Sequence, residues 1–230
     1  MNCELIVALD VDSRDAALRL RDQIVGVADF FKVGKELFTA IGPSILDDLS
    51  ECRVFLDLKF HDIPNTVARA VQTAARAGVE IVNVHVSGGR TMLEAARAAA
   101  DSQNGGPLLY GVTVLTHLDD NDLLEVGICD GSREQVVRLA QLSTDVRLDG
   151  VVASAWETEL VVQESKGQLD VIVPGVRPVW ASNVHDQKRV STLGDAARAG
   201  AKFIVVGRSI TQSKNPRDAA KRVVEELEST

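Results

Sequence analysis

The sequence contains few cysteines, and they are widely spaced. Cys3, Cys52 and Cys129 form no C-x-x-C pair and no metal-ligand spacing, and they leave an odd number. This pattern gives no sign of a metal site and is typical of a protein of the reducing cytosol. We therefore expect a cytoplasmic protein without a structural metal.

Long apolar runs are also missing. No stretch approaches the roughly 20 apolar residues that a membrane-spanning helix needs. The chain opens with Met1-Asn2-Cys3-Glu4 and a short apolar run to Leu9, which lacks the basic start and the length of a signal peptide. We expect neither a membrane span nor a secretory leader.

No basic run and no linker interrupts the chain. The formal net charge is −8, with acidic and basic residues interspersed, so nucleic acid and anionic membrane surfaces are poor partners. A few convergent Lys and Arg side chains in a cleft can still hold the phosphate of a small molecule. The 230 residues, 45% of them hydrophobic, suit one domain over residues 1–230.

What the chain does contain is a regular alternation of short apolar strands with amphipathic helices. The expected strands are mostly apolar segments of four to eight residues and lie at 5–10, 30–34, 54–60, 81–86, 108–115, 150–154, 170–173 and 202–206. Helices are expected between them, for example one over residues 35–50 and one over residues 192–199. Eight such units in a chain of this length predict an α/β fold, the (β/α)₈ TIM barrel.

The barrel prediction places many polar residues at the carboxyl ends of strands, where the active sites of such barrels lie. These residues are Asp10, Lys32, Asp57, Lys59, His85, Thr116, Ser154, Arg177 and Arg208. The loops after the last two strands commonly bind phosphate in this fold, and here they read Pro174-Gly175-Val176-Arg177 and Gly207-Arg208-Ser209. Taken singly, Lys32 could be a surface lysine and His85 a packed core histidine.

The most informative stretch is residues 54–66. Apolar residues at period two put Asp57 and Lys59 together on the other face of the strand, and Pro64 suits the first turn of a helix. Burying this ion pair is costly, and removing either partner would leave an uncompensated charge worth roughly 3–5 kcal/mol, so the pair favours a role in chemistry. The alternatives to a chemical role are a structural ion pair on an edge strand for Asp57 and Lys59 and an N-cap role for Asp62.

Several motifs together resemble one family, orotidine 5′-phosphate decarboxylase, from about residue 4 to residue 225. They are Ala8-Leu9-Asp10, Phe31-Lys32-Val33-Gly34, Asp57-Leu58-Lys59-Phe60-His61-Asp62-Ile63-Pro64-Asn65-Thr66, Val173-Pro174-Gly175-Val176-Arg177, Asp186-Gln187-Lys188-Arg189 and Val206-Gly207-Arg208-Ser209-Ile210. The resemblance implies a homodimer of TIM barrels that makes uridine 5′-monophosphate (UMP), the last step of de novo pyrimidine nucleotide synthesis, without metal or organic cofactor. His185 departs from the expected pattern and would affect the loop over residues 180–189 more than the chemistry.

The resemblance also implies a role for each matching residue. Lys59 would protonate C6 of the pyrimidine, Asp57 would lie beside the substrate carboxylate, and Lys32 would bridge Asp57 and the ribose. The remaining contacts would be a ribose hydroxyl for Asp10, the pyrimidine edge for Thr116 and Ser154, the phosphate for Arg177, Gln187, Gly207 and Arg208, and the partner subunit's site for Asp62 and Thr66.

Two other functions stay open at this point. A related Asp-x-Lys-x-x-Asp strand serves magnesium-dependent decarboxylases or aldolases of keto-sugar phosphates, which would need further carboxylates at strand ends. A barrel that only binds a phosphorylated nucleotide is the other alternative, but it would have no use for a buried Asp57–Lys59 pair.

Overall fold

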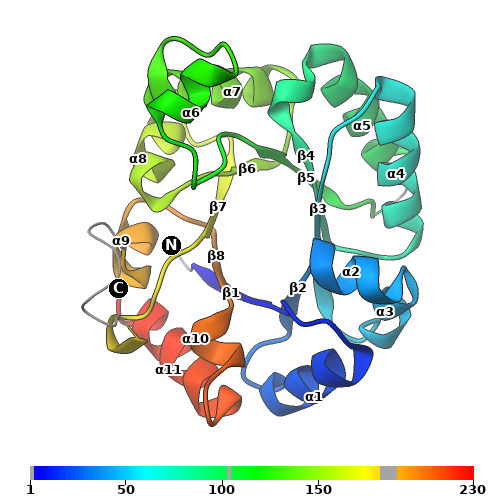
Figure 1. Ribbon diagram of the computed structural model, residues 1–230, viewed down its shortest axis with the longest axis vertical. Helices are drawn as coiled ribbons and strands as arrows, with labels where there is room; N and C mark the ends of the chain where they lie inside the picture. The colour runs from blue at the N-terminus through cyan, green and yellow to red at the C-terminus, as the bar shows by residue number, and fades with distance from the viewer. Residues whose placement is uncertain (1–2, 103–104, 182–190) are drawn as a thin grey trace.

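The computed structural model describes residues 3–102, 105–181 and 191–230 and forms a closed eight-stranded parallel barrel. The strands pair in chain order, and β1 closes the ring by pairing with β8. Figure 1 shows them as an inner ring with the helices outside it. The strands are β1 Glu4–Ala8, β2 Phe30–Gly34, β3 Arg53–Phe60, β4 Ile81–His85, β5 Leu108–Val112, β6 Gly150–Val152, β7 Asp170–Pro174 and β8 Phe203–Val206. The predicted TIM barrel is confirmed.

At least one α-helix follows each strand. The helices are α1 Arg14–Ile24, α2 Lys35–Ile41, α3 Ser44–Asp48, α4 Pro64–Arg76, α5 Arg90–Asp101, α6 Asp120–Glu125, α7 Gly131–Asp145, α8 Ala155–Glu164, α9 Leu193–Arg198, α10 Arg208–Thr211 and α11 Pro216–Glu228, with short 3₁₀ turns η1 Val86–Gly88 and η2 Val179–Ala181. Over the described ranges, none of these helices is both long and apolar enough to cross a bilayer.

One helix prediction was wrong. Residues 35–50 form two short helices, α2 and α3, and not one. The break is at Gly42, whose φ of 80° lies in the left-handed region, followed by Pro43, which has no backbone N–H to continue the helix. Both residues are visible in the sequence, and they are the ordinary punctuation of a helix end.

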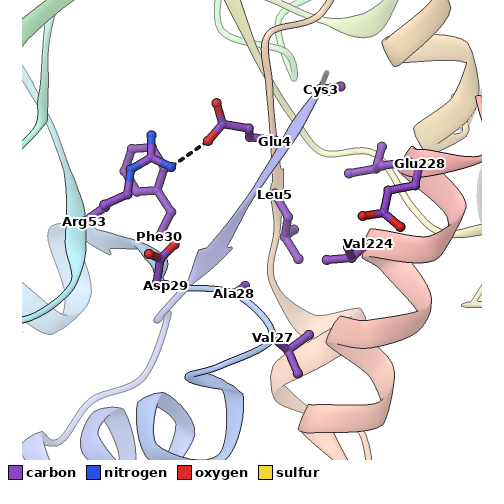
Figure 2. Close-up of a pocket in the computed structure, with 11 residues that line it drawn as sticks. Cys3, Glu4, Leu5, Val27, Ala28, Asp29, Phe30, Arg53, Val224 and Glu228 are labelled. Atoms are coloured by element: carbon purple, nitrogen blue, oxygen red, sulfur yellow. Dashed lines mark hydrogen bonds and ion pairs between the residues drawn. The ribbon is translucent and has the colours of Figure 1, made fainter. Parts of the chain in front are cut away.

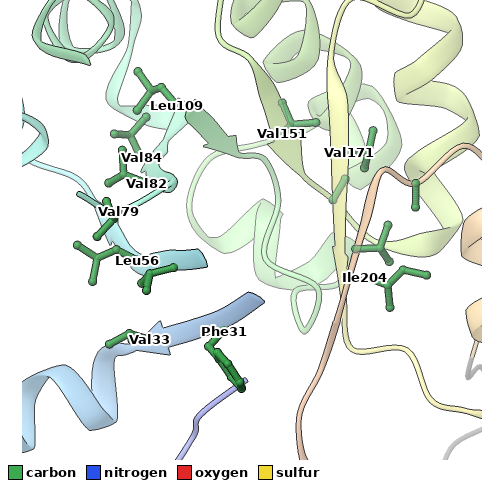
Figure 3. Close-up of a cluster of buried hydrophobic side chains, with 14 of the residues drawn as sticks. Phe31, Val33, Leu56, Val79, Val82, Val84, Leu109, Val151, Val171 and Ile204 are labelled. Atoms are coloured by element: carbon green, nitrogen blue, oxygen red, sulfur yellow. The ribbon is translucent and has the colours of Figure 1, made fainter. Parts of the chain in front are cut away.

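The alternation of side chains along the strands produces two separate apolar layers. Outward-facing residues such as Val33, Leu56 and Val82 pack under the helices in the larger layer, part of which is drawn in Figure 3. Inward-facing residues fill the barrel and form the smaller layer of Ile6, Ala8, Phe30, Phe55, Ile81, Tyr110, Val112, Val152, Ile172, Phe203 and Val205. Each large side chain buried in this way contributes about 1.5–3 kcal/mol to folding. The interior is therefore a packed core that supports the strand ends.

At the amino-terminal end of the barrel, Arg53 links β3 to β1 and to the residue that precedes β4. Its guanidinium donates two hydrogen bonds to Glu80, of 2.8 and 2.7 Å, and one of 2.6 Å to Glu4. Its Cζ lies 4.2 Å from the centroid of the Phe30 ring, and Figure 2 shows Arg53, Phe30 and Glu4 at one side of a small pocket. The two carboxylates hold the pKa of Arg53 well above its usual range. This end of a TIM barrel serves stability.

We expect Arg53→Ala to lower the free energy of unfolding by about 1–2 kcal/mol, because it leaves two carboxylates without their cation while solvent screens the loss. The Arg53 side chain is 34% exposed, so water partly compensates. Urea unfolding would measure the change. Arg198→Ala is the control, since Arg198 pairs with Asp195 on the exposed face of α9 and its loss should change stability by less than about 0.5 kcal/mol. Equal stability of wild type and Arg53→Ala would contradict this role.

Candidate active site

Four side chains of alternating charge line up at the carboxyl ends of β1, β2 and β3. The Nζ of Lys32 lies 2.8 Å from Asp10 Oδ1 and 3.5 Å from Asp57 Oδ2, and Lys59 Nζ lies 2.5 Å from Asp57 Oδ1. We call Asp10, Lys32, Asp57 and Lys59 the charged row. The side chain of Asp10 is 50% exposed, whereas that of Asp57 is only 13% exposed. Lys32 and Asp57, the two middle members of the row, therefore each have an opposite charge on both sides. They are largely shielded from water, so these ion pairs are strong.

The closed barrel removes one alternative reading of this pair. Asp57 and Lys59 cannot form an ion pair on an edge strand, because β3 is paired with β2 on one side and β4 on the other. Both residues point toward the inside of the barrel mouth and line a common cavity. The pair thus lies where such barrels carry out chemistry.

The backbone of β3 departs from a regular strand at this point. Its pairing with β4 shifts between Leu56 and Phe60, and Lys59 has a φ of 54°. A lysine in the left-handed region costs roughly 1–2 kcal/mol, and such strain concentrates at functional sites. The prediction that Asp57 and Lys59 share a face is confirmed. Beyond Asp57, however, a bulge brings Lys59 to this face, and not the regular alternation of a strand.

Two connected cavities open beside the charged row. The inner one, of about 210 Å³, has Lys32, Asp57 and Lys59 on one side. Apart from Thr116, its other walls are apolar and consist of Phe55, Val112, Val114, Leu115, Val152, Ile172, Pro174 and Val205. The outer cleft, of about 600 Å³, shares Lys32, Asp57 and Thr116 with it and extends to Arg177 and Arg208. Together they suit an elongated small molecule with a flat, mostly apolar end and an anionic end.

The predicted binding residues of the outer cleft are largely brought together. Asp10, Thr116, Ser154, Arg177, Gly207 and Arg208 all line it. Arg177 is half-buried after β7, and Arg208 is an exposed residue at the start of α10. Ser154 caps α8, and its hydroxyl donates a 2.6 Å hydrogen bond to Glu157. Its hydroxyl proton is therefore already used, which leaves the oxygen as an acceptor.

Two predicted site residues lie elsewhere. Asp62 and Thr66 are exposed, and neither belongs to the residues that line the two cavities. The carboxylate of Asp62 accepts a 2.6 Å hydrogen bond from the backbone N–H of Ile63, a residue that is 66% exposed. Ile63, not Asp62, is the N-cap of α4. Gln187 and His185 lie outside the described residues, as does nearly all of the 180–189 loop.

Two residues beside the charged row, Asn83 and Gly34, had no predicted role. Asn83 is completely buried in β4 and hydrogen-bonds both Asp57 and the backbone of Lys59. Gly34 ends β2, and a Cβ there would lie 2.8 Å from Lys32 Nζ and 3.1 Å from Asp10 Oδ1. In the sequence, the only signal for Asn83 was a polar residue two positions before His85. The only signal for Gly34 was a glycine at the end of the strand that carries Lys32.

His85 lies at the end of β4 and is half-buried. Its ring centroid is 5.3 Å from that of His61. Burial, with a smaller contribution from His61, lowers the pKa of His85 to about 4, so the ring is neutral at pH 7. A neutral, packed histidine agrees with the interpretation made from the sequence.

The fold and these two cavities define a (β/α)₈ barrel with a candidate active site at the carboxyl ends of its strands, the arrangement typical of enzymes with this fold. Residues 4–223 match the model of the orotidine 5′-phosphate decarboxylase / HUMPS family. The chain belongs to this family, and the resemblance read from the sequence is confirmed.

Individual relatives agree over nearly the whole chain. A protein of Actinobacillus succinogenes named orotidine 5′-phosphate decarboxylase is 46% identical over 226 residues, which cover 97% of each protein. The crystal structure of orotidine 5′-phosphate decarboxylase from Lactobacillus acidophilus is 31% identical, with a TM-score of 0.86 over 98% of this chain and 99% of that one. The inhibitor-bound enzyme of Methanocaldococcus jannaschii, 24% identical, supports the fold, with a TM-score of 0.80 over 99% of each chain.

Proposed function

We propose that the protein decarboxylates orotidine 5′-monophosphate (OMP) to UMP and carbon dioxide, the last step of de novo pyrimidine nucleotide synthesis. The observation that carries this proposal is the charged row, which faces an apolar pocket that opens into an arginine-bearing cleft. The names of the relatives point to the same reaction. Residues 1–230 would form a single catalytic domain.

The two cavities suggest how the substrate lies. The flat pyrimidine suits the inner pocket, where apolar side chains face it and Thr116 is at the mouth. The 5′-phosphate suits the far end of the outer cleft, where Arg177 and Arg208 supply charge and Gly207 supplies backbone. Gln187 and Ser154 would complete the contacts to the phosphate and the pyrimidine edge. Asp10 and Lys32 would hold the ribose hydroxyls between these two ends.

Decarboxylation then requires a positive charge close to C6 of the pyrimidine. Loss of carbon dioxide breaks the bond between C6 and the carboxyl carbon and leaves the electron pair on C6, where the ring offers no electron sink. The ammonium group of Lys59, held against Asp57, would stabilise this negative charge and give its proton to C6. The apolar walls exclude water and strengthen the interaction. Asp57 would lie beside the departing carboxylate, and its repulsion is a smaller contribution.

Phosphate binding also has a part in the rate. The phosphate would lie at the opposite end of the substrate from C6, so its binding energy can be used to lower the barrier at C6 and not only to hold the substrate. In this view the outer cleft contributes to turnover as well as to affinity. The protein would need no metal or organic cofactor.

We further propose a cytoplasmic homodimer in which Asp62 and Thr66 complete the partner subunit's site. Their exposure, beside the exposed apolar side chain of Ile63, supports a contact with another surface. Asp62 would then extend the charged row from the partner's side. Neither nucleic acid nor a membrane is an expected partner, given the net charge of −8.

The magnesium-dependent alternative finds little support at the strand ends. Asp57 is contacted by two lysines and an amide, a setting that already neutralises its charge. Across residues 3–102, 105–181 and 191–230, no group of three His, Cys, Asp or Glu side chains gathers in a metal-binding arrangement. A direct assay with a chelator separates the two reactions.

The decisive experiment follows the ultraviolet absorbance of OMP after purified protein is added, with and without EDTA. We expect conversion to UMP at the same rate in both samples. No conversion would contradict the proposed function. A rate that EDTA abolishes and magnesium restores would contradict the cofactor-free mechanism, and keto-sugar phosphates would be the substrates to test next.

A further inference from the structure

The ladder between β3 and β4 opens beside the charged row. Leu56 pairs with Val82 and Phe60 pairs with Val84, so three residues of β3 lie opposite a single residue of β4, Asn83. Such a bulge leaves backbone groups without their usual ladder partners. The backbone N–H of Lys59 is one of them, and a buried donor of this kind needs an acceptor from elsewhere.

The side chain of Asn83 supplies that acceptor and makes a second contact at the same time. Its Oδ1 accepts a 2.8 Å hydrogen bond from the backbone N–H of Lys59, and its Nδ2 donates a 2.7 Å hydrogen bond to Asp57 Oδ1. The same Asp57 oxygen is 2.5 Å from Lys59 Nζ. One amide thus bridges both members of the ion pair, one through its backbone and the other through its carboxylate.

Asn83 does not reach the cavities itself. It is completely buried, and it is absent from the residues that line the inner pocket and the outer cleft. Any effect of Asn83 on the reaction must therefore pass through Asp57 and Lys59. The backbone of Lys59 is also in the left-handed region. Such a conformation persists only where surrounding contacts hold it in place.

We propose that Asn83 is a positioning residue, which fixes the backbone of Lys59 in its left-handed conformation and orients the Asp57 carboxylate so that the ion pair points into the inner pocket. This inference rests on the proposed decarboxylation and deepens it. An amide suits this task because it offers an acceptor and a donor together. Aspartate would keep only the acceptor and would place a second carboxylate against Asp57.

Two variants separate the two hydrogen bonds of Asn83. Asn83→Ala removes both hydrogen bonds, and Asn83→Asp keeps the size of the side chain and the acceptor for Lys59 but loses the donor. We expect both to lower kcat for OMP by about 100-fold, the effect of misplacing a catalytic group by about 1 Å. The dissociation constant of UMP should stay within about threefold of wild type, because the phosphate and the apolar walls are untouched.

Hydrogen exchange of the Lys59 amide gives a readout that does not depend on any substrate. We expect this amide to exchange at least about tenfold faster in Asn83→Ala than in wild type, and at the wild-type rate in Asn83→Asp, which retains the acceptor. Thr113→Val is the matched control. Thr113 is also buried, directly after β5, donates a 2.9 Å hydrogen bond to the carbonyl of Val152, and is not among the residues that line the two cavities.

The results decide between positioning and mere packing. A fall in kcat with UMP binding retained in the Asn83 variants, and unchanged kcat in Thr113→Val, would support the proposal. Unchanged kcat in either folded Asn83 variant would overturn it, as would a parallel loss of kcat and UMP affinity. If Asn83→Ala does not fold, Asn83→Asp decides. A wild-type protein that does not convert OMP would instead refute the proposed function, and the exchange of the Lys59 amide would then decide whether Asn83 fixes this backbone.

Discussion

Lys59→Ala is expected to lower kcat for OMP by at least about 10⁴-fold while UMP still binds. The expected loss is large because one ammonium group would supply both the proton for C6 and the charge that stabilises the carbanion, and the two contributions are lost together. Binding should persist, since the outer cleft around Arg177 and Arg208 is unchanged. Single-turnover absorbance measures the first quantity, and titration calorimetry with UMP measures the second.

The fold should survive this substitution. Asp57 keeps Lys32 at 3.5 Å and the amide of Asn83 at 2.7 Å, so its carboxylate is not left without partners. Lys202→Ala is a suitable control, because Lys202 is an exposed lysine at the opposite end of the barrel, just before β8, and its loss should leave kcat unchanged. If Lys59→Ala loses UMP binding and turnover to the same extent, the Asp57–Lys59 pair is a structural feature and not the catalytic centre.

The sequence predicted the frame of this site well, because strand ends are encoded locally. The first strand, for example, is a short apolar run that turns polar at its last residue, so Asp10 could be assigned to a strand end from that change alone. The closed barrel then brought these ends together as expected. The resemblance to a family added roles that no spacing rule contains, above all those of Asp62 and Thr66.

The parts that could not be predicted depend on contacts between strands. The bulge before Phe60 is invisible in the period-two pattern, which continues through it in the sequence. Asn83 acquires its meaning only when β4 is placed against the opened part of β3. Gly34 likewise appears as an ordinary strand end until Lys32 and Asp10 occupy the space above it. Such features follow from tertiary geometry, which a single sequence does not display.

Arg208→Ala should act on the other end of the substrate and mainly weaken binding. We expect the dissociation constant of UMP and the KM for OMP to rise about 30- to 100-fold, the loss of one charge-assisted contact to a phosphate. The effect on kcat should be smaller, because Arg208 lies at the end of the outer cleft away from the inner pocket that holds Lys59.

Uridine provides the internal control for this prediction, since it has the base and the ribose but no phosphate. If Arg208 binds the phosphate, wild type and Arg208→Ala should bind uridine equally weakly, and only UMP should distinguish them. Arg198→Ala, an exposed arginine that pairs with Asp195 on α9, should bind UMP as wild type does. A variant that loses uridine and UMP affinity in the same proportion would show that Arg208 supports the shape of the cleft. Arg177 and the backbone of Gly207, which line the same cleft, would then be the groups left to hold the phosphate.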